Sequence, residues 1–388
     1  MSMPCLTEPS ENQLIIGIAT TLREKREIYR FRYRVYVEEM GMRLASADSG
    51  DKLLYDDMDR WAVLIYAKAG GRIVGTQRVN IGTLDEFPED LAQFLQLPRF
   101  EKFYGEGGRG RYAYTSKLMV APTYRNSAVL HLLTAKGYEL YCDQGVHFNF
   151  GVCNFHLLRL YEQFGGRRIG GPFSAPGYDG VLAPFVILVD DVEHLRAVRS
   201  PFYRQARKRG VSGGPVSEWF KREFSEQAGI INSQLVSEDE LWEALSRRLK
   251  GAPNMAMPLL RGLSAADASR FLHDCGLVLP CRPGDYIARQ GFTSHTLKVL
   301  LTGRVRTVGP ADVGAKVVRP GQCFGTAGLV EQPGYIEDVY AVTAAEVLVL
   351  SRLAFQRFQH SHPEVADIIV RNMHRLTGDR SHRRQVAK

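Results

Sequence analysis

Apolar residues in the first half of the chain follow two alternating patterns. Short runs that are apolar or alternate with polar residues predict strands at residues 61–68, 72–79, 116–120, 146–153 and 183–190. Apolar residues at helical spacing predict helices at residues 22–41, 128–141 and 157–164. Gly70 and Gly71 predict a tight turn between the first two strands. The alternation predicts an α+β domain.

The pattern changes after about residue 256. A helix is predicted at residues 259–275 and another helical stretch at residues 354–376. Between them, glycines and prolines separate short predicted strands at residues 286–289, 297–301, 304–308, 316–319 and 346–350. Regular turns between short strands predict a β-roll with flanking helices.

We therefore expect three parts along the chain. Residues 12–200 form the α+β domain, residues 201–255 a linker, and residues 256–378 the β-roll. The linker starts with basic residues. It also holds a bridging helix, because Ser237 is followed three residues later by Glu240, the pattern of a capping box.

Composition narrows the functional classes. The 388 residues carry a net charge of +8, which favours an acidic partner. The six cysteines form no CxxC pair, which argues against a metal site and a disulfide framework and favours a reducing, cytoplasmic location. No apolar run reaches about 18 residues, so we expect no membrane span, with peripheral membrane contact left open.

The predicted strand and helix at residues 146–166 carry a recognisable motif. Asn154 follows the strand, and the helix ends in Leu160-Tyr161-Glu162-Gln163-Phe164-Gly165. This pattern resembles the signature of the GNAT superfamily of N-acyltransferases. The resemblance implies two neighbouring parallel strands that splay apart and admit the pantetheine arm of an acyl thioester, with Asn154 beside the donor.

The same resemblance assigns roles to residues on these strands and on the helix. Free backbone groups of Leu118, Met119 and Val120 would bind the pantetheine amides, because buried N–H and C=O groups need partners. Tyr161 would protonate the leaving thiolate. The alternative is that Tyr161 only belongs to the apolar stripe of its helix.

The stretch that would grip the pyrophosphate of coenzyme A departs from the superfamily pattern. It reads Arg125-Asn126-Ser127-Ala128-Val129-Leu130, so Arg125 matches but neither expected glycine is present. Glycines there let backbone N–H groups reach the phosphates. Their absence favours acyl-acyl carrier protein over acyl-coenzyme A as the donor, and we expect no permanently bound cofactor.

Three segments point to one branch of the superfamily. Residues 31–41, 55–59 and 77–79 resemble the acyl-homoserine lactone synthases and the related long-chain N-acyl amino acid synthases, which use acyl-acyl carrier protein. By position, the residues that match the branch are Arg32, Tyr36, Asp56, Asp59 and Arg78.

The lactone-synthase pattern is incomplete in this chain. Tyr114 stands where the branch has a Glu, Lys117 where it has an Arg, and Met42 where it has a Trp. The resemblance therefore implies an N-acyl amino acid product more than a homoserine lactone.

The acyl carrier protein and the acceptor amine would each require particular residues at the site. A strongly acidic carrier would be steered by a basic rim, for which the candidates are Arg109, Arg111, Lys117, Arg125, Arg167 and Arg168. The acceptor amine must lose a proton, and Asp56 or Asp59 is a candidate to take it. The alternative is that these aspartates pair with Arg32 and Arg34 to hold the first helix.

The β-roll also resembles a known family. Residues 282–291 and 297–303 resemble the PGExIxxxG and YxxxxG patterns of the cyclic-nucleotide-binding domain. A phosphate-binding cassette would follow, beginning Phe324-Gly325-Thr326-Ala327 and ending at Ala341. The resemblance implies the fold of that family.

Two side chains of the nucleotide site are replaced. Thr326 stands where the family has the Glu that binds the ribose, and Tyr335 stands where it has the Arg that pairs with the cyclic phosphate. Loss of one partner of a buried charge pair costs about 3–5 kcal/mol. We expect a degenerate pocket whose domain serves contact or dimerisation. Binding of cyclic AMP or cyclic GMP, or of a different ligand, stays an alternative.

Three functions remain open, and the first is our leading hypothesis. It is an N-acyltransferase that moves a long acyl chain from acyl carrier protein, or coenzyme A, to a small-molecule amine such as an amino acid. The second is a lysine acetyltransferase that uses acetyl-coenzyme A and is gated by cyclic AMP. The third is a non-enzymatic regulatory protein. We expect no nucleic-acid partner, because about 12 residues after Leu376 leave no room for a reading helix. A homodimer stays open.

Overall fold

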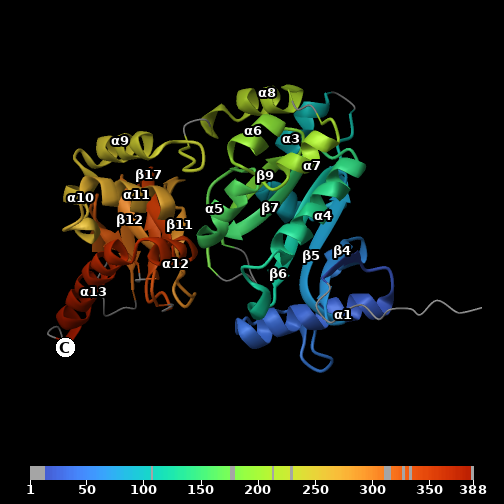
Figure 1. Cartoon of the computed structure of the whole chain (residues 1–388), viewed down its shortest axis with the longest axis horizontal. Helices are drawn as coiled ribbons and strands as arrows, with labels where there is room; N and C mark the ends of the chain where they lie inside the picture. The colour runs from blue at the N-terminus through green and yellow to red at the C-terminus, as the bar shows by residue number, and fades with distance from the viewer. Residues whose placement is uncertain are drawn as a thin grey trace, which may run out of the picture. The chain divides into compact units, whose positions relative to one another are not determined.

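The computed structural model describes residues 14–105, 108–174, 180–211, 214–227, 230–309, 316–325, 328–331 and 334–385, with side chains as far as Leu376. The chain divides into two compact units (Figure 1). The first unit ends at Gly151 and is completed by Val186–Trp219, and the second joins Val152–Phe185 to the residues from Phe220 onward. Because this division is not linear along the chain, the boundaries at 12–200, 201–255 and 256–378 stay a prediction.

A seven-stranded sheet has the order β1-β4-β5-β6-β7-β9-β8. Its strands are β1 (Ile15–Ile18), β4 (Val63–Ala69), β5 (Arg72–Gly82), β6 (Tyr112–Val120), β7 (Phe148–Asn154), β8 (Gly166–Arg168) and β9 (Leu182–Leu188). The predicted hairpin between β4 and β5 is confirmed, and Gly70 and Gly71 turn the chain with φ of +55° and +70°. All five strands predicted in this half are present.

The first helix, α1 (Leu22–Tyr33), begins at a capping box. The Thr21 side chain accepts from the Glu24 backbone N–H, and the Glu24 carboxylate accepts from the Thr21 backbone N–H. The predicted helix at residues 22–41 is therefore confirmed, but its last part, Arg34–Glu39, winds as a π-helix. Ile28 and Phe31 pack with Leu64 of β4 in one hydrophobic cluster.

Helix α4 (Val129–Asp143) covers the opposite face of the sheet. A Cβ on Gly75 would lie 2.8 Å from Leu133, and a Cβ on Gly137 would lie 2.9 Å from the Gln77 amide, so helix and strand backbones approach closely. Gly75 and Gln77 lie on the face of β5 that α4 covers. Arg78 and its cross-strand neighbour Leu64 lie on the other face, which α1 covers. Successive side chains of a strand alternate between faces, so α1 and α4 lie on different sides.

Strand β6 carries a bulge, and its pairing with β7 stops early. Ser116 pairs with Arg78 and Met119 with Thr76, so Lys117 and Leu118 together face one residue of β5. Lys117 has φ of +51°, which is uncommon for a residue with a Cβ. In the described part of the two strands, parallel pairing with β7 ends at Tyr114.

Other short elements complete the first unit. They are β2 (Ala47–Asp48), β3 (Leu53–Leu54), α2 (Glu89–Phe94), α3 (Leu97–Glu101), α6 (Val192–Ala197), α7 (Tyr203–Lys208) and most of α8 (Gly214–Glu223).

The second unit contains the predicted β-roll, built from two four-stranded antiparallel sheets (Figure 1). Their orders are β10-β17-β12-β15 and β11-β16-β13-β14. The strands are β10 (Gly276–Cys281), β11 (Tyr286–Ala288), β12 (Thr296–Thr302), β13 (Val305–Val308), β14 (Lys316–Val318), β15 (Cys323–Phe324), β16 (Asp338–Ala341) and β17 (Ala345–Ser351). The five strands predicted here are present, and β10, β15 and β16 were not predicted.

Helices flank these sheets. They are α5 (Phe155–Gln163), α9 (Glu238–Leu249), α10 (Pro253–Ala256), α11 (Ala265–Cys275), α12 (Arg352–Ser361) and α13 (Pro363–Gln385). The predicted capping box of the bridging helix is confirmed, since Ser237 and Glu240 cap α9. The two long helices predicted in this half are wrong as single helices. The first breaks at Gly262, where φ is +86°, and the second breaks before Pro363.

Helix α5 and strand β8 belong to the second unit and are tied to it by two arginines. Arg159 Nη1 donates to the carbonyl oxygens of His273 and Gly276 at 2.7 and 3.2 Å. Arg168 Nη2 donates to the Ile231 carbonyl at 2.9 Å.

Among the residues that the structure describes, no helix has the length and apolarity that a membrane span requires.

Candidate active site

Four charged residues predicted from three separate segments meet at α1. Arg32 Nη1 lies 2.7 Å from Asp59 Oδ1, and the two side chains are 0% and 2% exposed. Arg78 Nη1 lies 3.2 Å from Asp59 Oδ2 and also pairs with Asp56. The structure therefore brings Arg32, Asp56, Asp59 and Arg78 into one buried network. Their predicted chemical roles stay predictions.

A short turn positions the two aspartates. Asp56 caps the 3-10 helix Asp57–Arg60, because its Oδ1 accepts from the Met58 N–H at 3.1 Å. The Asp59 carboxylate accepts from the Asp56 N–H at 3.0 Å. Burial raises the pKa of Asp59, but the charges of Arg32 and Arg78 outweigh it, so the pKa lies below its usual value. Asp59 is therefore held ionised.

Lys117 joins this network from the bulge of β6. Its side chain is 13% exposed, and Nζ lies 3.9 Å from Asp56 Oδ2 and 5.2 Å from the centre of the Tyr36 ring. Burial and the neighbouring charge of Arg78 lower the pKa of Lys117 to about 8. The ammonium form is thus destabilised, although Asp56 is close.

Buried donors remain in the same region. Within the described residues, Nε and Nη2 of Arg32 have no hydrogen-bond partner. Asn80 donates to the Met58 carbonyl at 2.8 Å, while its Oδ1 is without a partner. Unpaired buried polar groups are costly, so they are candidates for binding a polar ligand.

The predicted donor side lies at the end of β6. Met119 and Val120 pair with β5 on one edge, and the other edge is beyond the last pair with β7. Arg125 Nε donates to the Val120 carbonyl at 3.2 Å, and the Arg125 guanidinium pairs with Glu39. One of the expected backbone acceptors is thus already engaged.

The turn before α4 replaces the missing glycines with local polar contacts. Asn126 has φ of +73°. The Ser127 hydroxyl donates to the Tyr124 carbonyl at 2.7 Å and accepts from the Val129 N–H at 3.3 Å. The Val129 backbone N–H, which a phosphate would otherwise bind, is therefore hydrogen-bonded to the Ser127 side chain.

The remaining predicted site residues of this half lie in the second unit. Asn154 is the residue before α5, and Tyr161 lies within it. The Tyr161 ring centre is 4.6 Å from that of Phe185. The expected place of Arg168 on a basic rim is wrong, because its side chain is 4% exposed and its Nε lies 2.8 Å from Glu162 Oε1.

In the described part of the predicted nucleotide pocket, side chains contact one another. Phe324 is buried at the end of β15, and Thr326 and Ala327 lie outside the described residues. The Tyr335 hydroxyl accepts a hydrogen bond from Nζ of Lys298, a lysine of β12 that is 2% exposed. A Cβ on Gly325 would lie 3.3 Å from the Tyr335 ring, so the ring packs on the start of the cassette.

Further groups surround this pair. Lys298 Nζ also donates to the Thr296 hydroxyl at 2.9 Å. Burial raises the pKa of Tyr335, but the charge and hydrogen bond of Lys298 outweigh it, so the pKa lies below its usual value. The rings of His156 and His295 lie 4.5 Å apart, and burial together with His295 and Lys298 lowers the pKa of His156 to about 3.

Two family models match the chain. Residues 31–135 match the family described as "Acetyltransferase (GNAT) domain", and residues 278–362 match "Cyclic nucleotide-binding domain". The chain carries an acyltransferase domain of the GNAT type and a cyclic nucleotide-binding domain. The network around Asp59 lies within the first match, and the Lys298–Tyr335 pair lies within the second.

Similarity to individual proteins is limited. Glutaminase 1 of Bradyrhizobium diazoefficiens is 32% identical over 123 residues, which are 32% of this chain and 20% of the glutaminase. The chain therefore spans 20% of the length of that curated relative. The activity, substrates and partners of the whole protein are therefore matters of proposal.

Two solved structures are similar to parts of the chain. FeeM, an N-acyl amino acid synthase from uncultured soil microbes, has 15% identity and a TM-score of 0.39, and covers 48% of this chain and 98% of its own. The Catabolite Activator Protein of Thermus thermophilus has 21% identity and a TM-score of 0.30, and covers 33% of this chain and 60% of its own.

Sequence reasoning missed the local surroundings of two lysines. From the sequence, Lys117 is identified as the residue in place of an Arg and as a candidate of the basic rim, and Lys298 is not identified. The available signal for Lys298 was a lone charge within the apolar run Thr296–Thr302. For Lys117 no signal in the sequence indicates that two arginines from other segments lie beside it.

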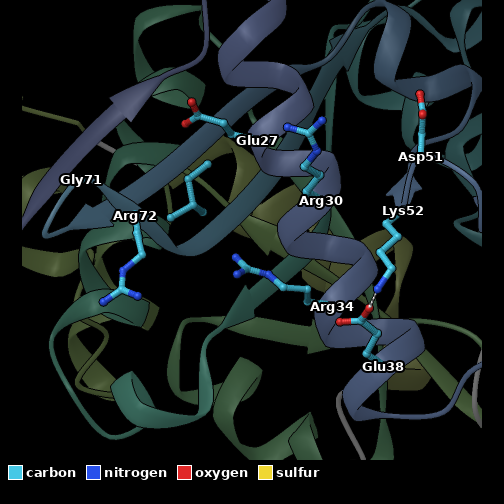
Figure 2. Close-up of a pocket in the computed structure, with 9 residues that line it drawn as sticks. Glu27, Arg30, Arg34, Glu38, Asp51, Lys52, Gly71 and Arg72 are labelled. Atoms are coloured by element: carbon cyan, nitrogen blue, oxygen red, sulfur yellow. Dashed lines mark hydrogen bonds and ion pairs between the residues drawn. The ribbon is translucent and has the colours of Figure 1, made fainter.

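The GNAT half also carries a surface pocket of about 420 Å³ on the outer side of α1 (Figure 2). Its carboxylates are all paired, Glu38 with Lys52, Asp51 with Arg26, and Glu27 with Lys68, each at 2.9 Å. Three further arginines line the pocket and form no ion pair with a described residue. They are Arg30, Arg34 and Arg72. The pocket therefore has an uncompensated positive charge.

No group of three or more metal-ligating side chains occurs in the part of the chain that the structure describes.

Proposed function

We propose that this protein is an N-acyltransferase that transfers a long acyl chain from acyl-acyl carrier protein to a small amine such as an amino acid. The observation that carries the proposal is the end of the β6–β7 ladder at Tyr114, next to the buried charged network. An open strand edge suits a pantetheine arm, and the network suits a polar acceptor on the other side of the reacting carbonyl.

The turn before α4 supports a carrier protein as the donor. It has no glycine, and the Ser127 hydroxyl already accepts the Val129 N–H. A pyrophosphate would have to displace this contact, whereas a phosphopantetheine arm on a carrier protein ends outside the turn. An acidic carrier also suits the arginines of the α1 pocket, since complementary charges steer association.

The free donors of Arg32 support an acceptor that carries an anionic group. A guanidinium binds a carboxylate with two parallel hydrogen bonds, and two nitrogen atoms of Arg32 have no partner among the described residues. An amino acid provides both the amine to be acylated and such a carboxylate.

Tyr161 and Asn154 keep the roles that the resemblance implies. Tyr161 is the acid that gives a proton to the leaving thiolate, and Asn154 lies beside the thioester. A phenol suits this step because its hydroxyl is protonated at neutral pH and can donate.

The cyclic nucleotide-binding domain serves regulation or dimerisation without a cyclic nucleotide. Tyr335, which stands at the position of the family's arginine, accepts a hydrogen bond from Lys298. A buried pair of this kind satisfies both groups, so an entering phosphate would first have to separate them.

Direct assay tests the proposal. The purified chain is incubated with long-chain acyl-acyl carrier protein and a mixture of amino acids, and lipid extracts are examined by mass spectrometry. We expect N-acyl amino acids with the carrier-bound donor and much less product with the corresponding acyl-coenzyme A. Clear coenzyme A binding by calorimetry, together with no acylated amine, would refute the proposal.

A further inference from the structure

The network around Asp59 leaves the proposed reaction without an obvious base. An amine acceptor enters at neutral pH as an ammonium ion, which has no lone pair to attack a thioester. Asp59 is held ionised by two arginines and is a weak base for that reason. Asp56 is bound by Arg78 and by the Met58 N–H.

Resting on the function proposed above, we propose that Lys117, as a neutral amine, is the catalytic base that takes a proton from the acceptor ammonium. The sequence suggested two other roles for Lys117, a cation that helps to dock the carrier protein and a replacement for an arginine. The role of a base differs from both. An arginine at this position could not perform it, because its guanidinium stays protonated in proteins.

The backbone places Lys117 for this role. The residue sits on the bulge of β6, beyond the last residue pair with β7, and its backbone has a left-handed φ of +51°. Backbone strain of this kind costs free energy and is concentrated at functional sites. The side chain is 13% exposed, so few water molecules can solvate its charge.

Burial favours the neutral form of Lys117. The groups that face Lys117 are Arg78 from β5, Arg32 from α1, Asp56 and Asp59 from the turn, and the Tyr36 ring from the π-helix. Two arginines and two aspartates nearly cancel, so burial decides the balance. A pKa of about 8 leaves roughly one Lys117 in ten neutral at pH 7, several hundred times more than an ordinary lysine.

The proton balance is complete without a further reactant. Lys117 Nζ accepts one proton from the acceptor ammonium and becomes an ammonium itself. The freed amine attacks the thioester carbonyl, a C–N bond forms, and the C–S bond breaks. The second amine proton ends on the departing thiol, and Lys117 returns its proton to solvent.

Two acceptors separate this role from a structural one. An amino acid needs deprotonation at neutral pH, whereas hydroxylamine is largely uncharged there and needs no base. For Lys117→Arg we expect kcat/KM for the amino acid to fall by about 10²–10⁴, while kcat/KM for hydroxylamine changes by only a few-fold. Lys136→Arg is the matched control, because this lysine of α4 lies outside both the network and the α1 pocket.

Rescue provides a second readout. For Lys117→Ala we expect small primary amines in the buffer to restore amino-acid acylation, more strongly as the basicity of the amine rises. NMR of the wild-type chain with isotope-labelled lysines gives the pKa of Lys117 directly. Unimpaired amino-acid acylation by Lys117→Arg, equal losses with both acceptors, or titration of Lys117 near its ordinary value would each overturn the proposal. A wild-type chain that acylates neither acceptor would refute the proposed function itself and this inference with it.

Discussion

Arg32 Nη1 and Asp59 Oδ1 lie 2.7 Å apart, and neither side chain is more than 2% exposed. Removal of one charge would leave the other buried without its partner, which costs about 3–5 kcal/mol. We therefore expect Asp59→Asn to lower the free energy of unfolding by that amount, measured by urea denaturation. Asp57→Asn in the same turn is the control, because its side chain is 89% exposed and should change stability by less than about 0.5 kcal/mol.

The same aspartate predicts a pH dependence. Because the pKa of Asp59 is lower in the folded than in the unfolded chain, its contribution is present above the unfolded value of about 3.9 and is lost as the pH falls through the folded value. Stability of the wild type should fall more steeply on acidification than that of Asp59→Asn. Parallel curves would show that Asp59 is not held ionised by the arginines.

Tyr161→Phe tests the proposed acid. The substitution keeps the ring that packs on Phe185 and removes only the hydroxyl. We expect kcat to fall by about 10²–10⁴, with the larger loss at high pH, where solvent supplies fewer protons. The control is Tyr286→Phe in the cyclic nucleotide-binding domain. Unchanged turnover would show that Tyr161 is not the acid and only belongs to the apolar stripe of its helix.

Charge reversal tests whether the α1 pocket receives the carrier protein. With Arg30, Arg34 and Arg72 all changed to Glu, KM for acyl-acyl carrier protein should rise about tenfold or more, mainly at low salt. KM for a small acyl-pantetheine thioester should stay the same, since it has no acidic surface. Arg23→Glu is the control, as Arg23 lies on the same helix, is 90% exposed and is outside the pocket. Equal effects on both donors would argue against docking here.

The Lys298–Tyr335 pair predicts two results in the cyclic nucleotide-binding domain. Cyclic AMP and cyclic GMP should give no thermal shift, because the hydroxyl and ammonium already satisfy each other. Tyrosine ionisation followed by ultraviolet absorbance should show one phenol that titrates below the usual range. Lys298→Met should abolish that early phase. A nucleotide-dependent shift, or an early phase that survives Lys298→Met, would contradict this account.

How much of the fold and the site can be predicted from the sequence depends on whether the interactions that determine them are local or join distant segments. Hydrophobic periodicity is local, so the strands that were predicted in each half are present and the capping box at Ser237 is confirmed. Helix interruptions at Gly262 and Pro363 were missed because helical spacing continued across them. The network of Arg32 and Asp59 could be expected because family resemblance supplied both segments.

The properties of two lysines could not be predicted. The pKa of Lys117 depends on burial and on Arg78, and these act only after β5 and β6 pair. Lys298 meets Tyr335 across 37 residues of sequence. Neither environment is encoded in the neighbouring residues.

Two arginines, one in α5 and one in β8, limit where the chain can be divided into fragments. Arg159 and Arg168 donate to the backbone carbonyls of Ile231, His273 and Gly276. A gene cut between residues 168 and 231 would separate these guanidinium groups from these acceptors and leave the arginines on the segment that carries the acyltransferase motif. The acyltransferase motif therefore shares a compact unit with the β-roll, and we expect a fragment that ends between residues 168 and 231 to be destabilised.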